Sequence, residues 1–134
     1  MLHLEVYLIA EKYNLPDLET YALKECRYWL YHQSDAKEAW YEMVDVLPDA
    51  SDSAMPEIKK IIVEYGSASL LKLGGRDGEN FVRAHPDLAG DIIAHFWSDY
   101  KRRYWGVGPL TEEIADKWTE MLGLKEKYRC IELN

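Results

Sequence analysis

The chain is poor in cysteine and histidine and lacks a long apolar run. Its 134 residues include two cysteines and four histidines. Cys26 and Cys130 cannot form a disulfide framework, and a chain with so few cysteines is typical of a reducing compartment. No apolar stretch reaches the roughly 20 residues that a membrane-spanning helix needs, and no signal-peptide pattern opens the chain. We therefore expect an intracellular protein, cytoplasmic or nuclear, without a membrane partner.

Positive charge is also scarce. The chain has 16 Lys and Arg against 24 Asp and Glu, which gives a net charge of −8 and an isoelectric point near 5.0. Because proteins bind nucleic-acid backbones through basic surfaces, this balance argues against a nucleic-acid partner. Hydrophobic residues make up 48% and aromatic residues 13% of the chain, which is enough for one folded domain with a core.

The sequence contains no constellation typical of catalysis or metal binding. None of the histidines is paired with another ligand residue at metal-binding spacing; they are His3, His32, His85 and His95. Gly74, Gly75 and Gly78 lack the Lys-Ser/Thr and the preceding strand of a phosphate loop, so we interpret them as a helix stop and a flexible loop. We expect no catalytic, cofactor-binding or metal-binding residue.

Helical periodicity is what the sequence does have. The opening stretch predicts two helices, over residues 2–13 and 16–30, joined by a tight turn that ends at Pro16. Leu4 and Leu8 lie outside the inner face expected for the first helix, so this helix is apolar over most of its circumference and needs cover on more than one side. That inner face comprises Leu2, Val6, Ile9, Ala10 and Tyr13, and the inner face of the second helix comprises Leu18, Ala22, Cys26 and Trp29.

The rest of the chain continues in the same manner. Further helices are expected over residues 36–47, 56–73, 86–105 and 111–122, with a short helix at best over 79–84. A capping box at Asp35 and Glu38 opens the first of these, Thr111 is the expected cap of the last, and Gly123 suits the position just past its end. The expected inner face of the first comprises Ala36, Trp40, Met43, Val44 and Leu47, and that of the second includes Ile58, Ile61, Ile62 and Tyr65. Residues 127–134 are a short strand or extended chain. The sequence therefore predicts an all-α single domain of about six or seven helices, built from antiparallel hairpins.

One segment resembles a known family. Residues 6–13, VYLIAEKY, followed by Leu15, Leu18 and Ala22, are similar to the VYxLADKYxxxxLxxxA segment of BTB/POZ domains, especially those of fungi. The resemblance implies that residues 1–31 correspond to the last two helices of a BTB domain. It also implies that residues 32–134 form the helical extension that follows, packed with the hairpin as one domain. The strands and early helices of such a domain would precede residue 1.

This resemblance implies an adaptor that acts by protein–protein interaction. Without the BTB strands the opening helix loses part of its cover, and exposed apolar patches mark interfaces. We expect binding or self-association through Leu2, Leu4, Val6, Leu8, Ile9 and Tyr13. The expected partner is another protein, a second copy or the missing BTB portion. The family also implies a cullin-type ubiquitin ligase, although most of the cullin-contacting part lies upstream of residue 1.

Two alternatives stay open at this point. Lys101, Arg102 and Arg103 stand among aromatic residues and form a candidate patch for an acidic partner, although cations also gather at helix C-termini because of the macrodipole. A helical enzyme or small-ligand binder with an aromatic pocket is the second alternative. It would use the tryptophans, which are Trp29, Trp40, Trp97, Trp105 and Trp118. Packing is the simpler account of those that fall on expected inner faces.

Overall fold

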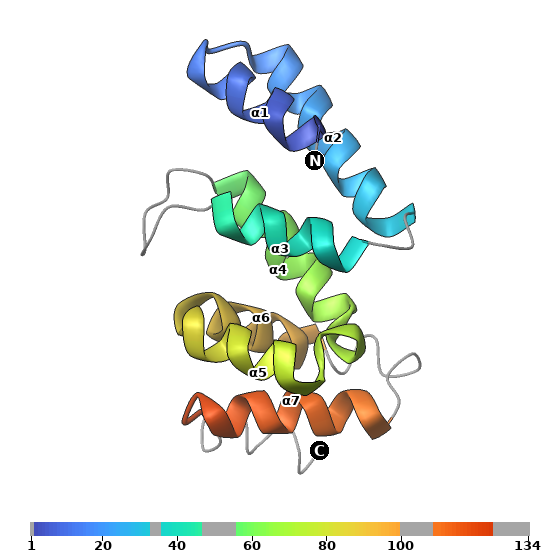
Figure 1. The fold of residues 1–134 in the computed structure, drawn as a ribbon, viewed down its shortest axis with the longest axis vertical. Coiled ribbons are helices and arrows are strands. Elements are labelled where there is room, and N and C mark those ends of the chain that lie inside the picture. Colours follow the sequence, from blue (N-terminus) through green and yellow to red (C-terminus); the bar gives the residue numbers. More distant parts are fainter. Residues whose placement is uncertain (1, 33–35, 47–55, 100–108, 125–134) are drawn as a thin grey trace. The chain divides into compact units, whose positions relative to one another are not determined.

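The computed structural model describes residues 2–32, 36–46, 56–99 and 109–124, and these form seven α-helices and one 3-10 turn with no strand (Figure 1). The predicted all-α class and the expected number of helices are confirmed. The elements are α1 (Leu2–Lys12), α2 (Pro16–His32), α3 (Ala36–Val46), α4 (Pro56–Ala68), η1 (Leu70–Leu73), α5 (Gly75–Ala84), α6 (Pro86–Asp99) and α7 (Pro109–Met121). The expected strand or extended segment at 127–134 lies outside the described residues.

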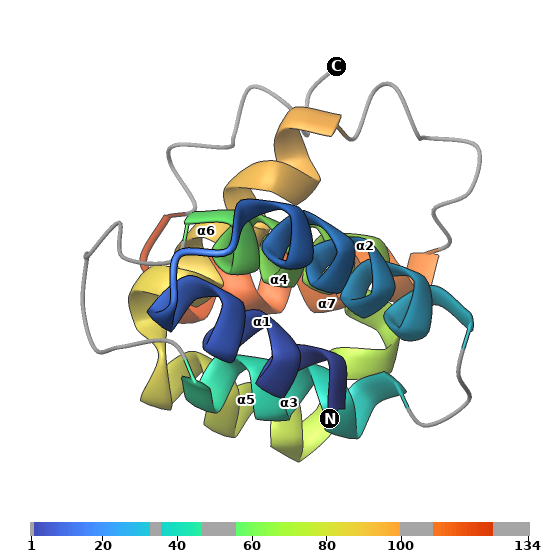
Figure 2. The same cartoon turned by 90° about the horizontal axis from the view of Figure 1, so that it is seen from above.

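The chain divides into two compact units, residues 1–65 and residues 66–134, and the boundary falls inside α4. The division after residue 31 that the family resemblance implies stays a prediction. In the first unit, α1 and α2 run antiparallel and lie side by side in both views (Figures 1 and 2). Their turn is the predicted one: Asn14 adopts a left-handed φ of 54°, and the Leu15 amide donates to the Ala10 carbonyl at 2.8 Å. This bond satisfies a helix-terminal carbonyl, and Pro16 then begins α2.

The core of the first unit is completed by α3 and α4. The indole Nε1 of Trp40 donates to the Ile62 carbonyl oxygen at 2.9 Å, which ties α3 to α4. The predicted inner faces of these two helices are buried; they comprise Ala36, Trp40, Met43 and Val44, and Ile58, Ile61, Ile62 and Tyr65. Two expected members, the cap Asp35 and the apolar Leu47, lie outside the described residues.

Gly74 and Gly78 approach neighbouring residues closely instead of forming a flexible loop. The predicted helix over 56–73 is divided: α4 ends at Ala68, a 3-10 turn follows, and α5 begins already at Gly75. Gly78 therefore lies inside a helix, where a Cβ atom would stand 1.7 Å from the Leu73 carbonyl oxygen. Any side chain at this position would collide with backbone, so the absence of a side chain is what the fold requires. The predicted flexible loop at this point is wrong.

Helices α5, α6 and α7 enclose the remaining core. The indole of Trp97 donates to Thr119 Oγ1 at 2.9 Å, and that hydroxyl donates to the Ala115 carbonyl oxygen at 2.7 Å. Helix α7 begins at Pro109, two residues before the expected cap Thr111, because proline is well suited to a first helical position. Gly123 ends α7 as predicted: its φ is 71°, and the Leu124 amide donates to the Thr119 carbonyl at 2.9 Å.

Candidate functional site

Helix α1 turns a different face inward from the one its periodicity predicts. The buried side chains are Leu4, Tyr7 and Ala10, whereas Ile9 and Tyr13 are 53% and 64% exposed. Tyr7 is 2% exposed and lies at the centre of this inner face, where its hydroxyl hydrogen-bonds the Glu11 side chain. Of the predicted inner face, Ala10 is buried as expected, whereas Ile9 and Tyr13 lie on the outer surface.

The predicted interaction residues divide according to this rotation. Leu4 is 4% exposed and is not available to a partner while the hairpin is folded. Val6 and Leu8 are half-buried. Ile9 and Tyr13 project outward, and the Lys12 ammonium lies 5.6 Å from the centroid of the Tyr13 ring. Leu2 belongs to α1, and its side chain lies outside the described part of the structure.

Helix α2 adds exposed residues that the sequence analysis missed. Its buried side chains are Ala22, Cys26 and Leu30, so Leu30 takes the place expected for Trp29, which is half-buried. Leu18, an expected inner residue, is 38% exposed. The exposed large apolar side chains of α2 and of the turn before it are Leu15, Leu18, Tyr21, Tyr28 and Tyr31. The seven-residue interval from Tyr21 to Tyr28 is the signal in the sequence that could have indicated an outer face.

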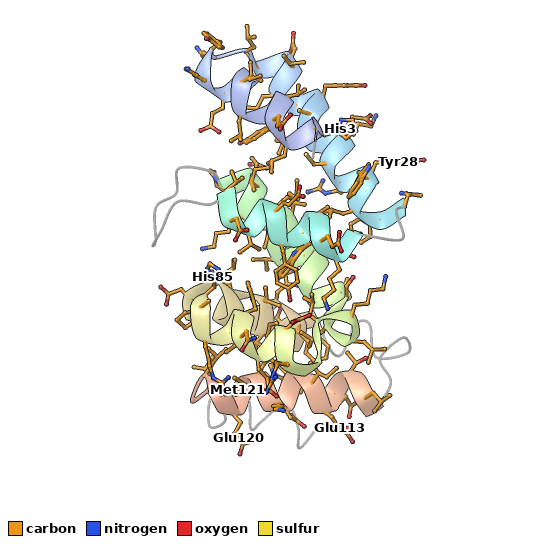
Figure 3. All side chains as sticks on the ribbon, viewed as in Figure 1. His3, Tyr28, His85, Glu113, Glu120 and Met121 are labelled. Carbon is orange, nitrogen blue, oxygen red and sulfur yellow. The ribbon has the colours of Figure 1, made fainter. Side chains whose placement is uncertain are left out.

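Several of these aromatic side chains have fixed neighbours. Tyr28 stacks on His32 with ring centroids 4.0 Å apart, and His32 Nδ1 lies 2.8 Å from the Tyr28 carbonyl oxygen. The Tyr31 ring meets the Tyr65 ring edge-on with 5.5 Å between centroids. Figure 3 shows Tyr28 projecting from the ribbon of α2. These contacts fix the positions of Tyr28 and Tyr31 on the outer surface of the hairpin.

Two groups inside the hairpin are held neutral. Burial, together with the carboxylates of Glu11 and Glu19, raises the pKa of Tyr7 to about 12. Burial likewise raises the pKa of the Cys26 thiol to about 11. The thiolate is the reactive form of cysteine, so this shift makes Cys26 an inert core residue in the folded protein, as its position on the inner face of α2 predicted.

The tryptophans that suggested an aromatic pocket pack in the two cores. Trp40, Trp97 and Trp118 are each at most 3% exposed, and the indoles of the first two donate to partners inside their own units. Trp105 lies outside the described residues, as do Lys101, Arg102 and Arg103, the candidate patch for an acidic partner.

The histidines keep their scattered positions. His95 Nδ1 lies 3.1 Å from the hydroxyl of Ser67, and His85 ends α5 just before Pro86 begins α6. Within the described ranges no three His, Cys, Asp or Glu side chains come together in a group able to hold a metal ion. Nor does any described helix combine the length and the hydropathy needed to cross a membrane.

Comparison with known proteins identifies no relative. No protein family, no curated protein and no solved structure matches the chain. The resemblance of residues 6–22 to BTB/POZ domains therefore stays a prediction.

Proposed function

We propose that the chain is a protein-interaction module that binds through the outer surface of the α1–α2 hairpin. One observation carries the proposal. Of the nine large hydrophobic side chains described as exposed, seven belong to residues 9–31: Ile9, Tyr13, Leu15, Leu18, Tyr21, Tyr28 and Tyr31. Single exposed apolar residues are ordinary, but a group on one small element is typical of an interface.

The chemical nature of this group supports contact with protein. Four of the seven residues are tyrosines, which offer a large apolar ring and a polar hydroxyl and lose little conformational entropy on binding. The motif at residues 6–22 supports a BTB/POZ-type adaptor as the biological setting. In that setting the partner is a second copy, the remainder of a BTB domain or a component of a cullin-type ubiquitin ligase.

Site-specific photo-crosslinking tests the proposal. A photoreactive phenylalanine analogue replaces Tyr13, Tyr21 or Tyr28, one at a time, in the full chain in cells of its source organism. We expect crosslinks to protein from at least one of these positions. The matched control is Leu110 in α7, which is 63% exposed and lies outside the hairpin. Equal crosslinking from Leu110 and from the three tyrosine positions, or none from those three, would contradict the proposal.

Leu4 is unsuitable as a reporter of binding. Its side chain is buried, so substitution by alanine would destabilise the hairpin through a cavity and lower binding indirectly. Ile9 and Tyr13 report on α1 without this complication because both are more than half exposed.

A further inference from the structure

We draw no further inference here: the strongest candidate, the row of exposed tyrosines Tyr21, Tyr28 and Tyr31 on α2, belongs to the surface already described, and nothing in the structure shows what covers it.

Discussion

The two compact units differ in how many large apolar side chains they expose. Among the described residues, the first unit exposes seven of them, all on the α1–α2 hairpin, whereas the second exposes Leu71 and Leu110. The inner faces of α3 and α4 in the first unit are buried as predicted, so among the described residues the difference arises in the hairpin. The residues that stabilise the fold and those available to a partner are therefore largely different residues, even within one helix.

In the second unit, neighbouring segments of the chain pack closely against one another, whereas the hairpin of the first unit has exposed apolar side chains. Gly78 brings α5 against the Leu73 carbonyl, and a Cβ at Gly74 would stand 2.6 Å from Ile114 Cδ1. Trp97 and Thr119 satisfy each other's polar groups inside the core. On α7, Lys117 Nζ donates to the Glu79 carboxylate of α5, which lowers the pKa of Glu79. In the residues described for this unit, Leu71 and Leu110 are the large apolar side chains left exposed.

Truncation of a core tryptophan should give the largest effect and should be confined to one unit. Trp40→Ala in the first unit and Trp118→Ala in the second each remove a fully buried side chain, and we expect a loss of about 3–5 kcal/mol in the free energy of unfolding. Hydrogen exchange followed by mass spectrometry reads the two units separately. Trp40→Ala should accelerate exchange mainly in residues 1–65 and Trp118→Ala mainly in residues 66–134. Equal acceleration throughout the chain in both variants would show that the units do not differ in this respect.

Substitution of glycine by alanine should change the stability in opposite directions at a tightly packed and at an open position of the second unit. Gly78→Ala places a Cβ against backbone that cannot move aside cheaply, and we expect a loss of about 3 kcal/mol. Gly90→Ala is the matched control: this glycine is in α6 and nothing lies within 4 Å of the added atom. There, alanine should stabilise by about 0.5–1 kcal/mol because it is the better helix former. Urea unfolding measures both, and a neutral Gly78→Ala would contradict the close approach.

The thiol of Cys26 should report on the closure of the hairpin's inner face. Its pKa of about 11 lies some two units above the ordinary value of 9.0, so at pH 8 the folded protein carries roughly a hundredfold less thiolate than the unfolded chain. We expect a correspondingly slow reaction with Ellman's reagent, measured in a Cys130→Ser background. Fast reaction at pH 8 without denaturant would show that the inner face is open.

The raised pKa of Cys26 also determines how the stability of the protein changes at alkaline pH. The folded state holds the thiol proton more tightly than the unfolded state, so this contribution to stability is complete below pH 9 and is lost as the pH rises towards 11. Tyr7 acts in the same direction between pH 10 and 12. Urea unfolding at pH 8 and at pH 10.5 should therefore show lower stability at the higher pH, and Cys26→Ala should reduce the difference.

Helix positions could be predicted from the sequence more reliably than helix faces. Proline at the first position marked the starts of α2, α4 and α6, and the four-residue intervals of Ile58, Ile62 and their neighbours identified the core of α4 correctly. Those helices have one apolar face, so periodicity has one solution. Helix α1 is apolar nearly all round, so its periodicity does not select one face, and the structure buries Leu4, Tyr7 and Ala10.

The glycines and the outer residues of α2 show why the rest was not predictable. Gly78 has the same local sequence signature whether it begins a loop or permits a close approach. What decides the matter is how the chain turns between η1 and α5, which brings the Leu73 carbonyl against this position, and the packing of Trp118 from α7 on the same glycine. Tyr21, Tyr28 and Tyr31 have the hydrophobic character of core residues. The seven-residue interval from Tyr21 to Tyr28 indicates a common face, and the burial of Ala22, Cys26 and Leu30 on the other side of α2 shows that this face is the outer one.

Substitution of the exposed tyrosines of α2 should have the smallest effect on stability. These variants therefore test most directly whether the hairpin of the first unit exposes residues that the fold does not need. Tyr21→Ala/Tyr28→Ala removes two rings that are 58% and 59% exposed, together with the stack on His32, which as an exposed i,i+4 contact is worth about 0.2–0.5 kcal/mol. We expect the free energy of unfolding to change by no more than about 0.5 kcal/mol. Leu110→Ala in the second unit should change it equally little. Photo-crosslinking to protein from an analogue at Tyr13 should be weakened only in the tyrosine variant. If that variant instead loses stability on the scale of the core tryptophans, the tyrosines belong to the fold of the first unit, and its outer surface would be as closed as that of the second.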